Sequence, residues 1–225
     1  MYEDAHLVVL NKPSGISMHK TSQNDQHRTI ADILVERYPS MKGVGEDPLR
    51  PGIVHRLDKE TSGLVMAAKD QQTFAYLKQL FQQRKVKKEY LALVHGIPSQ
   101  ERGTIAVPLG KLGTKQTTQI SGKRDLVERD AVTDYRVIRR FEKYALLEVS
   151  PKTGRTHQIR VHLKSIGHPL VGDTLYGPRK AQNPEGLHRL FLHAQRLEFP
   201  TPDGNALALE VDLPEDLQKT LSGLQ

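Results

Sequence analysis

One carboxylate stands among cations in the segment from His55 to Leu64, and turn-forming residues follow it. This is Asp58, with Arg56 two residues before it. A carboxylate can act as a nucleophile or bind a metal ion. The apolar run at 64–68 is typical of a buried strand, so we expect Asp58 at the end of an element, where a rigid scaffold can present it. The structural alternative is that Asp58 caps a turn and Arg56 is a surface charge.

A second polar cluster, at 153–163, is predicted to open a helix. Its apolar positions i, i+4 and i+7 form one stripe, while the polar side chains fall elsewhere around the helix. The stripe is Ile159, Leu163 and Ile166, and the polar set is Arg155, Gln158 and His162. A helix end that gathers cations and backbone N–H groups suits an anion, either a phosphate or the Asp58 carboxylate. A basic helix face in solvent is the alternative.

The remaining pattern predicts more strands than helices. Helices are expected at 29–38, from Asp70 to about Arg84, and from Thr156 to Gly167. Strands are expected at 7–10, 64–68, 90–94, 104–109, 132–138 and 144–149, and loops at 41–48 and 111–128. Because few helices interrupt the strands, this order favours an α+β fold with a mainly antiparallel sheet. We expect one domain over residues 1–225.

The charge distribution is compatible with a partner that carries a phosphate backbone, but it does not by itself identify one. The formal net charge is +7, made of +11 in residues 1–180 and −4 in residues 181–225. Basic clusters at 84–88 and 136–140 could follow a phosphate backbone, with affinity that falls as salt rises. A charge run is also typical of a solvated face, but Lys87 and Lys88 lead directly into Tyr90.

The absence of cysteine excludes disulfides, thiolate metal sites and cysteine nucleophiles. The acidic N-terminus and its short apolar run do not look like a signal peptide. No apolar stretch approaches the ~20 residues that span a membrane. We therefore expect a cytoplasmic protein, monomeric, with no membrane association.

Taken together, the motifs resemble those of the RluA-type pseudouridine synthases, which isomerise uridine in ribosomal and transfer RNA. The resemblance covers about four-fifths of the chain. It rests on the segments 11–15, 55–64, 88–94, 154–162, 167–177 and 191–194. It implies a curved, mainly antiparallel mixed sheet flanked by helices and bisected by an active-site cleft. The motifs begin within the first dozen residues, as in a member without an N-terminal S4 domain.

The resemblance also implies roles for five residues. Asp58 matches the catalytic aspartate, and Arg56 the arginine that fills the gap left by the flipped nucleotide. Tyr90 matches the tyrosine that stacks on the flipped uracil, and Arg155 the arginine that pairs with the catalytic carboxylate. Leu192 matches an apolar residue near the base. Considered alone, a residue such as Tyr90 is more often an ordinary half-buried strand residue, and one such as Leu192 an ordinary core residue.

The implied reaction breaks the N1–C1′ bond of uridine, rotates the uracil and joins C5 to C1′. It requires no cofactor and no metal. An ionised Asp58 would either attack the sugar or promote elimination to a glycal. A neighbouring Arg155 would favour the charged carboxylate.

Two other classes of function remain open from the sequence. The first is a metal-dependent phosphodiesterase that uses His55, Asp58, His157 and His162 as ligands. No second acidic cluster accompanies these residues, which counts against it. The second is a catalytically silent RNA-binding module of the same fold. The presence of Asp58, Tyr90 and Arg155 at the matching positions counts against it.

Overall fold

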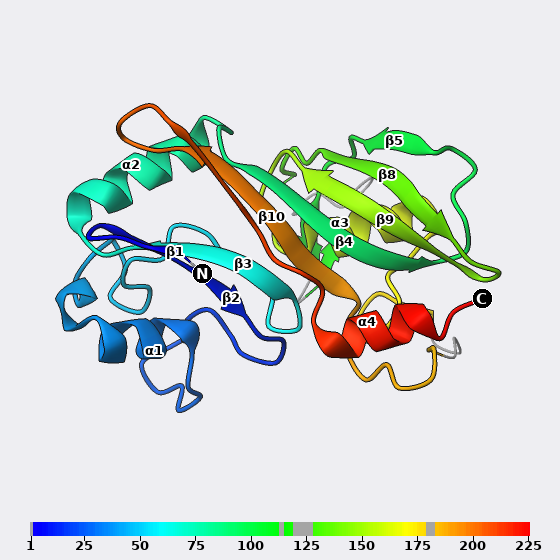
Figure 1. The fold of residues 1–225 in the computed structure, drawn as a ribbon, viewed down its shortest axis with the longest axis horizontal. Helices are drawn as coiled ribbons and strands as arrows, with labels where there is room; N and C mark the ends of the chain where they lie inside the picture. The colour runs from blue at the N-terminus through cyan, green and yellow to red at the C-terminus, as the bar shows by residue number, and fades with distance from the viewer. Residues whose placement is uncertain (1, 113–114, 119–127, 179–182) are drawn as a thin grey trace. The chain divides into compact units, whose positions relative to one another are not determined.

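The computed structural model describes residues 2–112, 115–118, 128–178 and 183–225. The chain divides into two compact units, and each is considered by itself. The first unit comprises Met1–Lys87 and Ala194–Val211, and the second comprises Lys88–His193 and Asp212–Gln225. Figure 1 shows the elements of both along the chain. Two of the three boundaries fall within strands, β4 (Lys87–His95) and β10 (Leu192–Pro200), and the third follows Val211.

The first unit is built on strands in the order β1-β2-β3-β10, with β11 paired to β10. Besides β10, these strands are β1 (Tyr2–Glu3), β2 (Leu7–Lys12), β3 (Ser62–Ala68) and β11 (Ala206–Glu210). The pairs β1–β2, β2–β3 and β10–β11 are antiparallel. All seven residues of β3 are buried, as a central strand requires.

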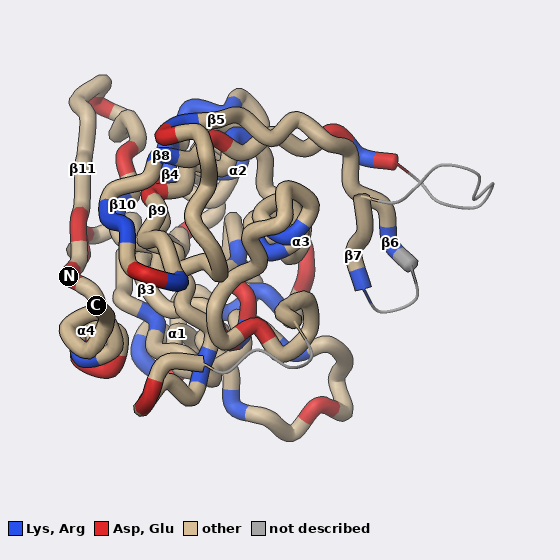
Figure 2. The backbone as a smooth tube through the Cα atoms, turned by 90° about the vertical axis from the view of Figure 1, so that its right-hand side faces the viewer, with Lys and Arg blue, Asp and Glu red and all other residues tan. Residues whose placement is uncertain are grey.

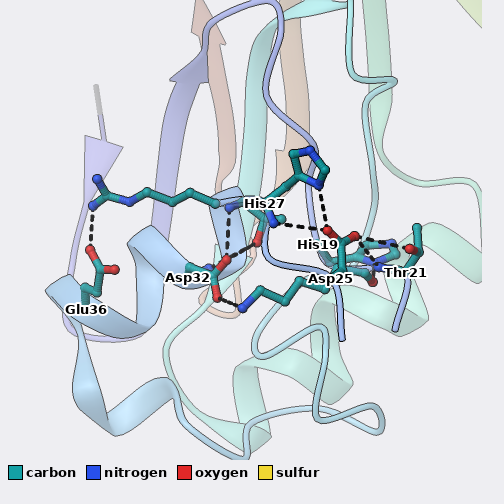
Figure 3. A network of polar contacts seen from close by, with 9 residues as sticks. His19, Thr21, Asp25, His27, Asp32 and Glu36 are labelled. Atoms are coloured by element: carbon teal, nitrogen blue, oxygen red, sulfur yellow. Dashed lines mark hydrogen bonds and ion pairs between the residues drawn. The ribbon is translucent and has the colours of Figure 1, made fainter. Parts of the chain in front are cut away.

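Helix α1 (Ile30–Arg37) begins at a capping box and ends before Pro39. Thr29 accepts from the Asp32 backbone N–H, and the Asp32 carboxylate accepts from the Thr29 N–H. Figure 3 shows the polar network around this start, in which Lys20 forms an ion pair with Asp32 and Asp25 accepts from Thr21. A 3-10 turn, η1 (Pro39–Met41), follows. The network therefore ties the segment before the helix to its first turn.

Helix α2 (Gln71–Gln82) is capped by Asp70, whose carboxylate accepts from the Thr73 N–H at 2.8 Å. The buried face of this helix packs against the sheet of the first unit. The cluster includes Phe74, Leu77 and Leu80 of α2 with Leu64, Met66, Leu197 and Phe199 of the strands. Burial of this face is what stabilises the helix against the strands.

The second unit contains the strand order β4-β9-β8-β5 and a separate pair β6-β7. These strands are β5 (Arg102–Ile105), β6 (Gly110–Leu112), β7 (Lys115–Thr117), β8 (Thr133–Arg140) and β9 (Tyr144–Pro151). All four pairings of these strands are antiparallel. Helix α4 (Glu215–Ser222) contributes Leu217 to a cluster with Leu91 and Leu93 of β4.

Helix α3 (Gln158–Ser165) contacts β7, β8 and β9 and is seen behind β8 and β9 in Figure 1. Its first six residues are all buried, including Gln158, Arg160 and His162. The expected division into an apolar stripe and a polar face is therefore wrong for this helix. Ile159 and Leu163 are buried as expected, but Ile166 is 37% exposed.

The α+β class with a mainly antiparallel sheet is confirmed. One expected loop, 111–128, is partly wrong, because 110–112 and 115–117 pair as strands. Residues 113–114 and 119–127 of that segment lie outside the described residues. Within the described chain, no helix has the length and apolar character needed to cross a membrane.

Candidate active site

Asp58 lies in the irregular segment that leads into β3. It begins a turn in which its carbonyl accepts from the Thr61 N–H at 3.1 Å. The side chain is half-buried, whereas Arg56 before it is exposed. The chain then enters the buried strand β3 at Ser62. Asp58 thus lies in the turn that directly precedes a buried strand, close to the position expected from the sequence.

A fully buried lysine holds this turn. Lys12 is 0% exposed. Its ammonium donates to three carbonyls: Pro13 at 2.8 Å, Ile16 at 3.0 Å and Lys59 at 3.1 Å. An ammonium has three N–H donors, so these carbonyls match its capacity. Lys59 directly follows Asp58, and Lys12 therefore ties the segment 13–16 to the turn.

Two further bonds join the same segments. The Gly15 N–H donates to the Lys59 carbonyl at 2.8 Å, and the Ser14 hydroxyl donates to the Glu60 carbonyl at 2.7 Å. On the other side of the turn, Gly63 has φ +116° and a Cβ there would lie 2.2 Å from the Ala194 carbonyl oxygen. Only glycine fits this close approach of two strands. The turn after Asp58 is accordingly held from both sides within the first unit.

His55 has a structural place in the first unit. Its Nε2 accepts from the Met66 backbone N–H at 3.0 Å, which requires a lone pair on that nitrogen. The ring stacks on Phe81 with centroids 4.8 Å apart. Nε2 is therefore already used in a contact to β3, and His55 helps to attach the Asp58 segment to the sheet and to α2.

In the second unit, Arg155 lies in the loop between β9 and α3. Its backbone N–H donates to the Gln158 Oε1 at 3.0 Å, and its Nε donates to the Asp130 carbonyl at 3.1 Å. The Thr153 hydroxyl also donates to the Gln158 Oε1, at 2.6 Å. The side chain of Arg155 is exposed. A buried glutamine thus holds the backbone of an exposed arginine.

The first residues of α3 are anchored to the segment 167–177 as well. Arg160 and Asp173 form a buried bidentate pair, with both N–O distances 2.8 Å. The Arg160 guanidinium offsets burial and holds the pKa of the Asp173 carboxyl below its usual range. His157, in the left-handed conformation (φ 54°), contacts the Tyr176 hydroxyl through Nδ1 at 2.8 Å.

Tyr90 and Leu192 are both buried, at 8% and 3% exposure. Tyr90 pairs with Val149 in the β4–β9 ladder. Because Leu91 and Leu93 contact the cluster that includes α4, alternation along the strand turns Tyr90 to the opposite face. Lys88 shares that face by the same period of two, and burial lowers the pKa of its ammonium to about 8.

The structure therefore groups the five predicted site residues in two sets. Arg56 and Asp58 lie in the first unit, and Tyr90, Arg155 and Leu192 lie in the second. Sequence reasoning gave no role to Lys12 or Gln158, although both stand inside the recognised motifs. A lysine directly before proline and a glutamine inside an otherwise basic run are the signals that could have drawn attention to them.

The histidines considered as metal ligands form hydrogen bonds within the protein. His162 uses both ring nitrogens, with Thr133 Oγ1 and the Val107 carbonyl each at 2.9 Å. Across the described parts of the chain, no group of three or more histidine and acidic side chains is placed to bind a metal ion.

The basic clusters are more balanced than the sequence suggests. Figure 2 shows acidic residues among the basic ones around β5 and β8. Arg136 pairs with Glu148 at 2.8 Å, and Arg140 with Glu101 at 3.1 Å. In the first unit, Lys87 pairs with Glu198 at 2.6 Å. These cations are partly neutralised, so any phosphate contact there must compete with an exposed ion pair.

The comparisons with known proteins assign the family. A family profile described as RNA pseudouridylate synthase matches residues 6–165. The chain is 39% identical over its whole length to an uncharacterized RNA pseudouridine synthase, YlyB, of Bacillus subtilis, covering 72% of that protein. It is also 39% identical to the ribosomal large subunit pseudouridine synthase D of Nitrosomonas europaea, covering 64%. The chain thus spans roughly two-thirds of the length of these relatives.

Solved structures agree. Human RNA pseudouridylate synthase domain containing 4 is 28% identical, with a TM-score of 0.77 over 100% of this chain and 92% of that one. Human RNA pseudouridylate synthase domain containing 1 is 26% identical, with a TM-score of 0.76 over 97% and 85%. This chain belongs to the RNA pseudouridine synthase family, whose members are isomerases, and the predicted resemblance is confirmed.

Proposed function

We propose that this chain isomerises uridine to pseudouridine in ribosomal or transfer RNA, with Asp58 as the catalytic carboxylate. The observation that carries the proposal is the Asp58 turn, held by Lys12 and by the 13–16 segment at the end of a buried strand. Such support is expected where a side chain must keep one geometry through a reaction. The Asp58 turn lies within residues 6–165, which match the family profile.

The reaction conserves every atom of the nucleoside. The N1–C1′ bond breaks, the uracil rotates, C5 bonds to C1′, and the C5 proton is replaced by a proton on N1. Ionised Asp58 acts in one of two ways: its oxygen bonds to C1′ and is later displaced, or it promotes elimination to a glycal. In both, the carboxylate must be charged, and Arg155 matches the arginine that the family pairs with it.

Base flipping requires two further side chains. The target uridine must leave its stack at a cost of a few kcal/mol. Arg56 is exposed, as a residue that enters a vacated stack must be. Tyr90 brings an aromatic ring on the face of β4 opposite Leu91, and Leu192 brings an apolar surface. We assign stacking on the flipped uracil to Tyr90 and packing near the base to Leu192.

The relatives favour ribosomal RNA as the substrate. Proteins from Nitrosomonas europaea, Zymomonas mobilis and Xanthomonas campestris that are 36–39% identical carry the name ribosomal large subunit pseudouridine synthase D. We therefore place large-subunit ribosomal RNA first among substrates, with transfer RNA second. The chain is proposed to act in the cytoplasm as a monomer and without cofactor, with residues 1–225 as one catalytic domain.

A metal-dependent phosphodiesterase is disfavoured by the hydrogen bonds of its proposed ligands. His162 has no ring nitrogen left for a metal ion, and the Nε2 of His55 accepts from the Met66 N–H. A site built on these residues would have to break bonds that are buried or partly buried.

Pseudouridine mapping tests the proposal. Total RNA from cells with and without the gene is treated with carbodiimide, and reverse-transcription stops are compared across ribosomal and transfer RNA. We expect at least one stop in large-subunit ribosomal RNA that requires the gene and returns with the wild-type chain. Identical stop patterns in all RNAs, confirmed with purified protein on the same RNAs, would contradict the proposed activity.

A further inference from the structure

Gln158 is 4% exposed, although glutamine is mostly a surface residue. Besides accepting from the Arg155 N–H and the Thr153 hydroxyl, it donates through Nε2. The acceptors are the Val132 carbonyl and the Thr133 hydroxyl, each at 2.9 Å. Both donors and both lone pairs of the amide are therefore used.

The chain of bonds continues to His162, which is 0% exposed. A carbonyl can only accept, so the contact to Val107 requires a proton on His162 Nε2. In the neutral ring Nδ1 then accepts, and the Thr133 hydroxyl donates to it. Burial lowers the pKa of His162, which favours this neutral form. The direction of every bond from Thr153 to Val107 is thereby determined.

The bonds connect the exposed Arg155 loop to the start of β8. Thr133 is the first residue of β8, and Val132 directly precedes it. The Val132 N–H in turn donates to the Thr153 hydroxyl at 3.1 Å. Gln158 is thus the central member of a closed, buried network, and a network satisfied at every atom holds one geometry.

We propose that Gln158 is a positioning residue for the isomerisation: with Thr133 and His162 behind it, it fixes the backbone of Arg155 and so holds the guanidinium in the one position that the reaction requires. The proposal rests on the function assigned above to Asp58 and Arg155. It explains why a glutamine and a histidine occur in a motif whose arginine alone is assigned a chemical role. Neither side chain touches RNA in this account.

Four variants separate positioning from folding. Gln158→Met keeps the length of the side chain and removes all four bonds. Thr133→Val keeps the shape and removes the hydroxyl between Gln158 and His162, whereas Thr133→Ser keeps the hydroxyl. Ile159→Val is the matched control, since Ile159 is buried in the same helix and its apolar side chain has no hydrogen bond to lose.

If Gln158 positions Arg155, variants that break its hydrogen bonds should lower kcat and leave KM nearly unchanged. With saturating RNA, we expect kcat to fall about 100-fold in Gln158→Met and about 10-fold in Thr133→Val, because small misplacements of a reacting group are costly. KM should stay within about 2-fold, since ground-state binding is untouched. Thr133→Ser and Ile159→Val should keep kcat. Full kcat in folded Gln158→Met, or in Thr133→Val if Gln158→Met does not fold, would overturn the proposal.

A double variant tests whether Gln158 acts through Arg155. Single-turnover rates are measured for Arg155→Ala and for Arg155→Ala with Gln158→Met. If Gln158 only positions Arg155, the second substitution costs nothing further once the guanidinium is gone. A loss as large as in the wild-type background would show an independent role and contradict positioning.

Amide hydrogen exchange gives a readout that needs no activity. The Arg155 N–H, which donates to Gln158, should exchange at least about 10-fold faster in Gln158→Met and unchanged in Ile159→Val. Unchanged exchange in Gln158→Met would overturn the proposal even if the enzyme is active. Faster exchange in Gln158→Met, together with a wild-type chain that forms no pseudouridine, would support the contact and reject only the proposed function.

Discussion

Two irregular loops carry the charged partners of the proposed reaction, and each is held by one buried polar side chain. The Asp58 turn is held by Lys12, which donates to three carbonyls. The Arg155 loop is held by Gln158, which accepts from an N–H and a hydroxyl and donates to a carbonyl and a hydroxyl. We call these two buried side chains, Lys12 and Gln158, the clamps of the turn and of the loop. The clamp of the turn meets only hydrogen-bond acceptors, whereas the clamp of the loop meets both donors and acceptors.

The two clamps should therefore fail differently. An ammonium has only donors, so it suits a site lined by carbonyls, and its loss takes a donor from three of them at once. An amide satisfies both kinds of group but contributes neutral bonds, which are weaker. We expect Lys12 to matter for folding and activity together, and Gln158 to matter chiefly for activity.

Lys12→Met should have the largest effect on stability. Methionine fills the space but leaves the carbonyls of Pro13, Ile16 and Lys59 without their shared donor. We expect the free energy of unfolding to fall by about 3 kcal/mol or more, measured by denaturant titration. Lys59→Met, an exposed change in the same turn, is the control and should cost little. Equal stability of the two variants would remove Lys12 as a clamp.

Arg155→Lys should leave the loop in place and impair the chemistry. Lysine keeps the backbone bond to Gln158 and loses only the exposed bond from Nε to the Asp130 carbonyl. It cannot reproduce a planar fork against a carboxylate. We expect kcat to fall about 100-fold, as for a misplaced reacting group, with an unchanged unfolding midpoint. Wild-type turnover in this variant would mean that the predicted pair with Asp58 does not matter.

Tyr90 is placed by a regular strand and needs no clamp, so its substitution isolates the ring. Tyr90→Leu should weaken RNA binding by about 1–3 kcal/mol, the usual value for stacking of a base on an aromatic ring. Tyr90→Phe keeps the ring and should bind as wild type. Fluorescence anisotropy with a stem-loop RNA measures both. Equal affinity of all three proteins would argue against stacking, and poor turnover of Tyr90→Phe alone would assign proton transfer to the hydroxyl.

The smallest expected effect is the dependence of folding stability on pH through His162, which supports Gln158 through Thr133. Burial lowers the folded-state pKa of His162, so the unfolded chain binds this proton more readily. Stability should therefore fall as pH drops below the unfolded value near 6.5, by at most about 1.4 kcal/mol per pH unit. Denaturant titrations at pH 7 and pH 5 should show a steeper loss in wild type than in His162→Asn. A steeper loss in His162→Asn would contradict the neutral, hydrogen-bonded ring.

The local patterns predicted the elements nearest the site well. Thr29 and Asp70 begin α1 and α2 as expected, because a side-chain cap is a short-range signal. The strands expected at 7–10, 64–68 and 144–149 appear as β2, β3 and β9. Asp58 lies at an element's end for the same reason, since turn residues and an apolar run are adjacent in the chain.

What the sequence did not predict depends on contacts between distant residues. β10, β11 and α4 were not expected, and the strand expected at 104–109 ends at Ile105. Gln158 and His162 seemed to belong to a polar helix face, yet they are buried because Val132, Thr133 and Val107 supply partners more than 20 residues away. Likewise, nothing around Lys12 in the chain reveals the Lys59 carbonyl 47 residues later. Polar residues with such partners cannot be told from solvated ones by periodicity.

The central claim is that Asp58 performs the covalent or elimination step of uridine isomerisation. The most direct test is pseudouridine formation by purified wild-type and Asp58→Asn proteins on the same large-subunit ribosomal RNA, with RNA affinity measured in parallel. Asparagine keeps the shape and the turn but removes the charge. We predict conversion by the wild type and none by Asp58→Asn at equal affinity. Turnover by Asp58→Asn at even about a tenth of the wild-type rate would contradict the claim.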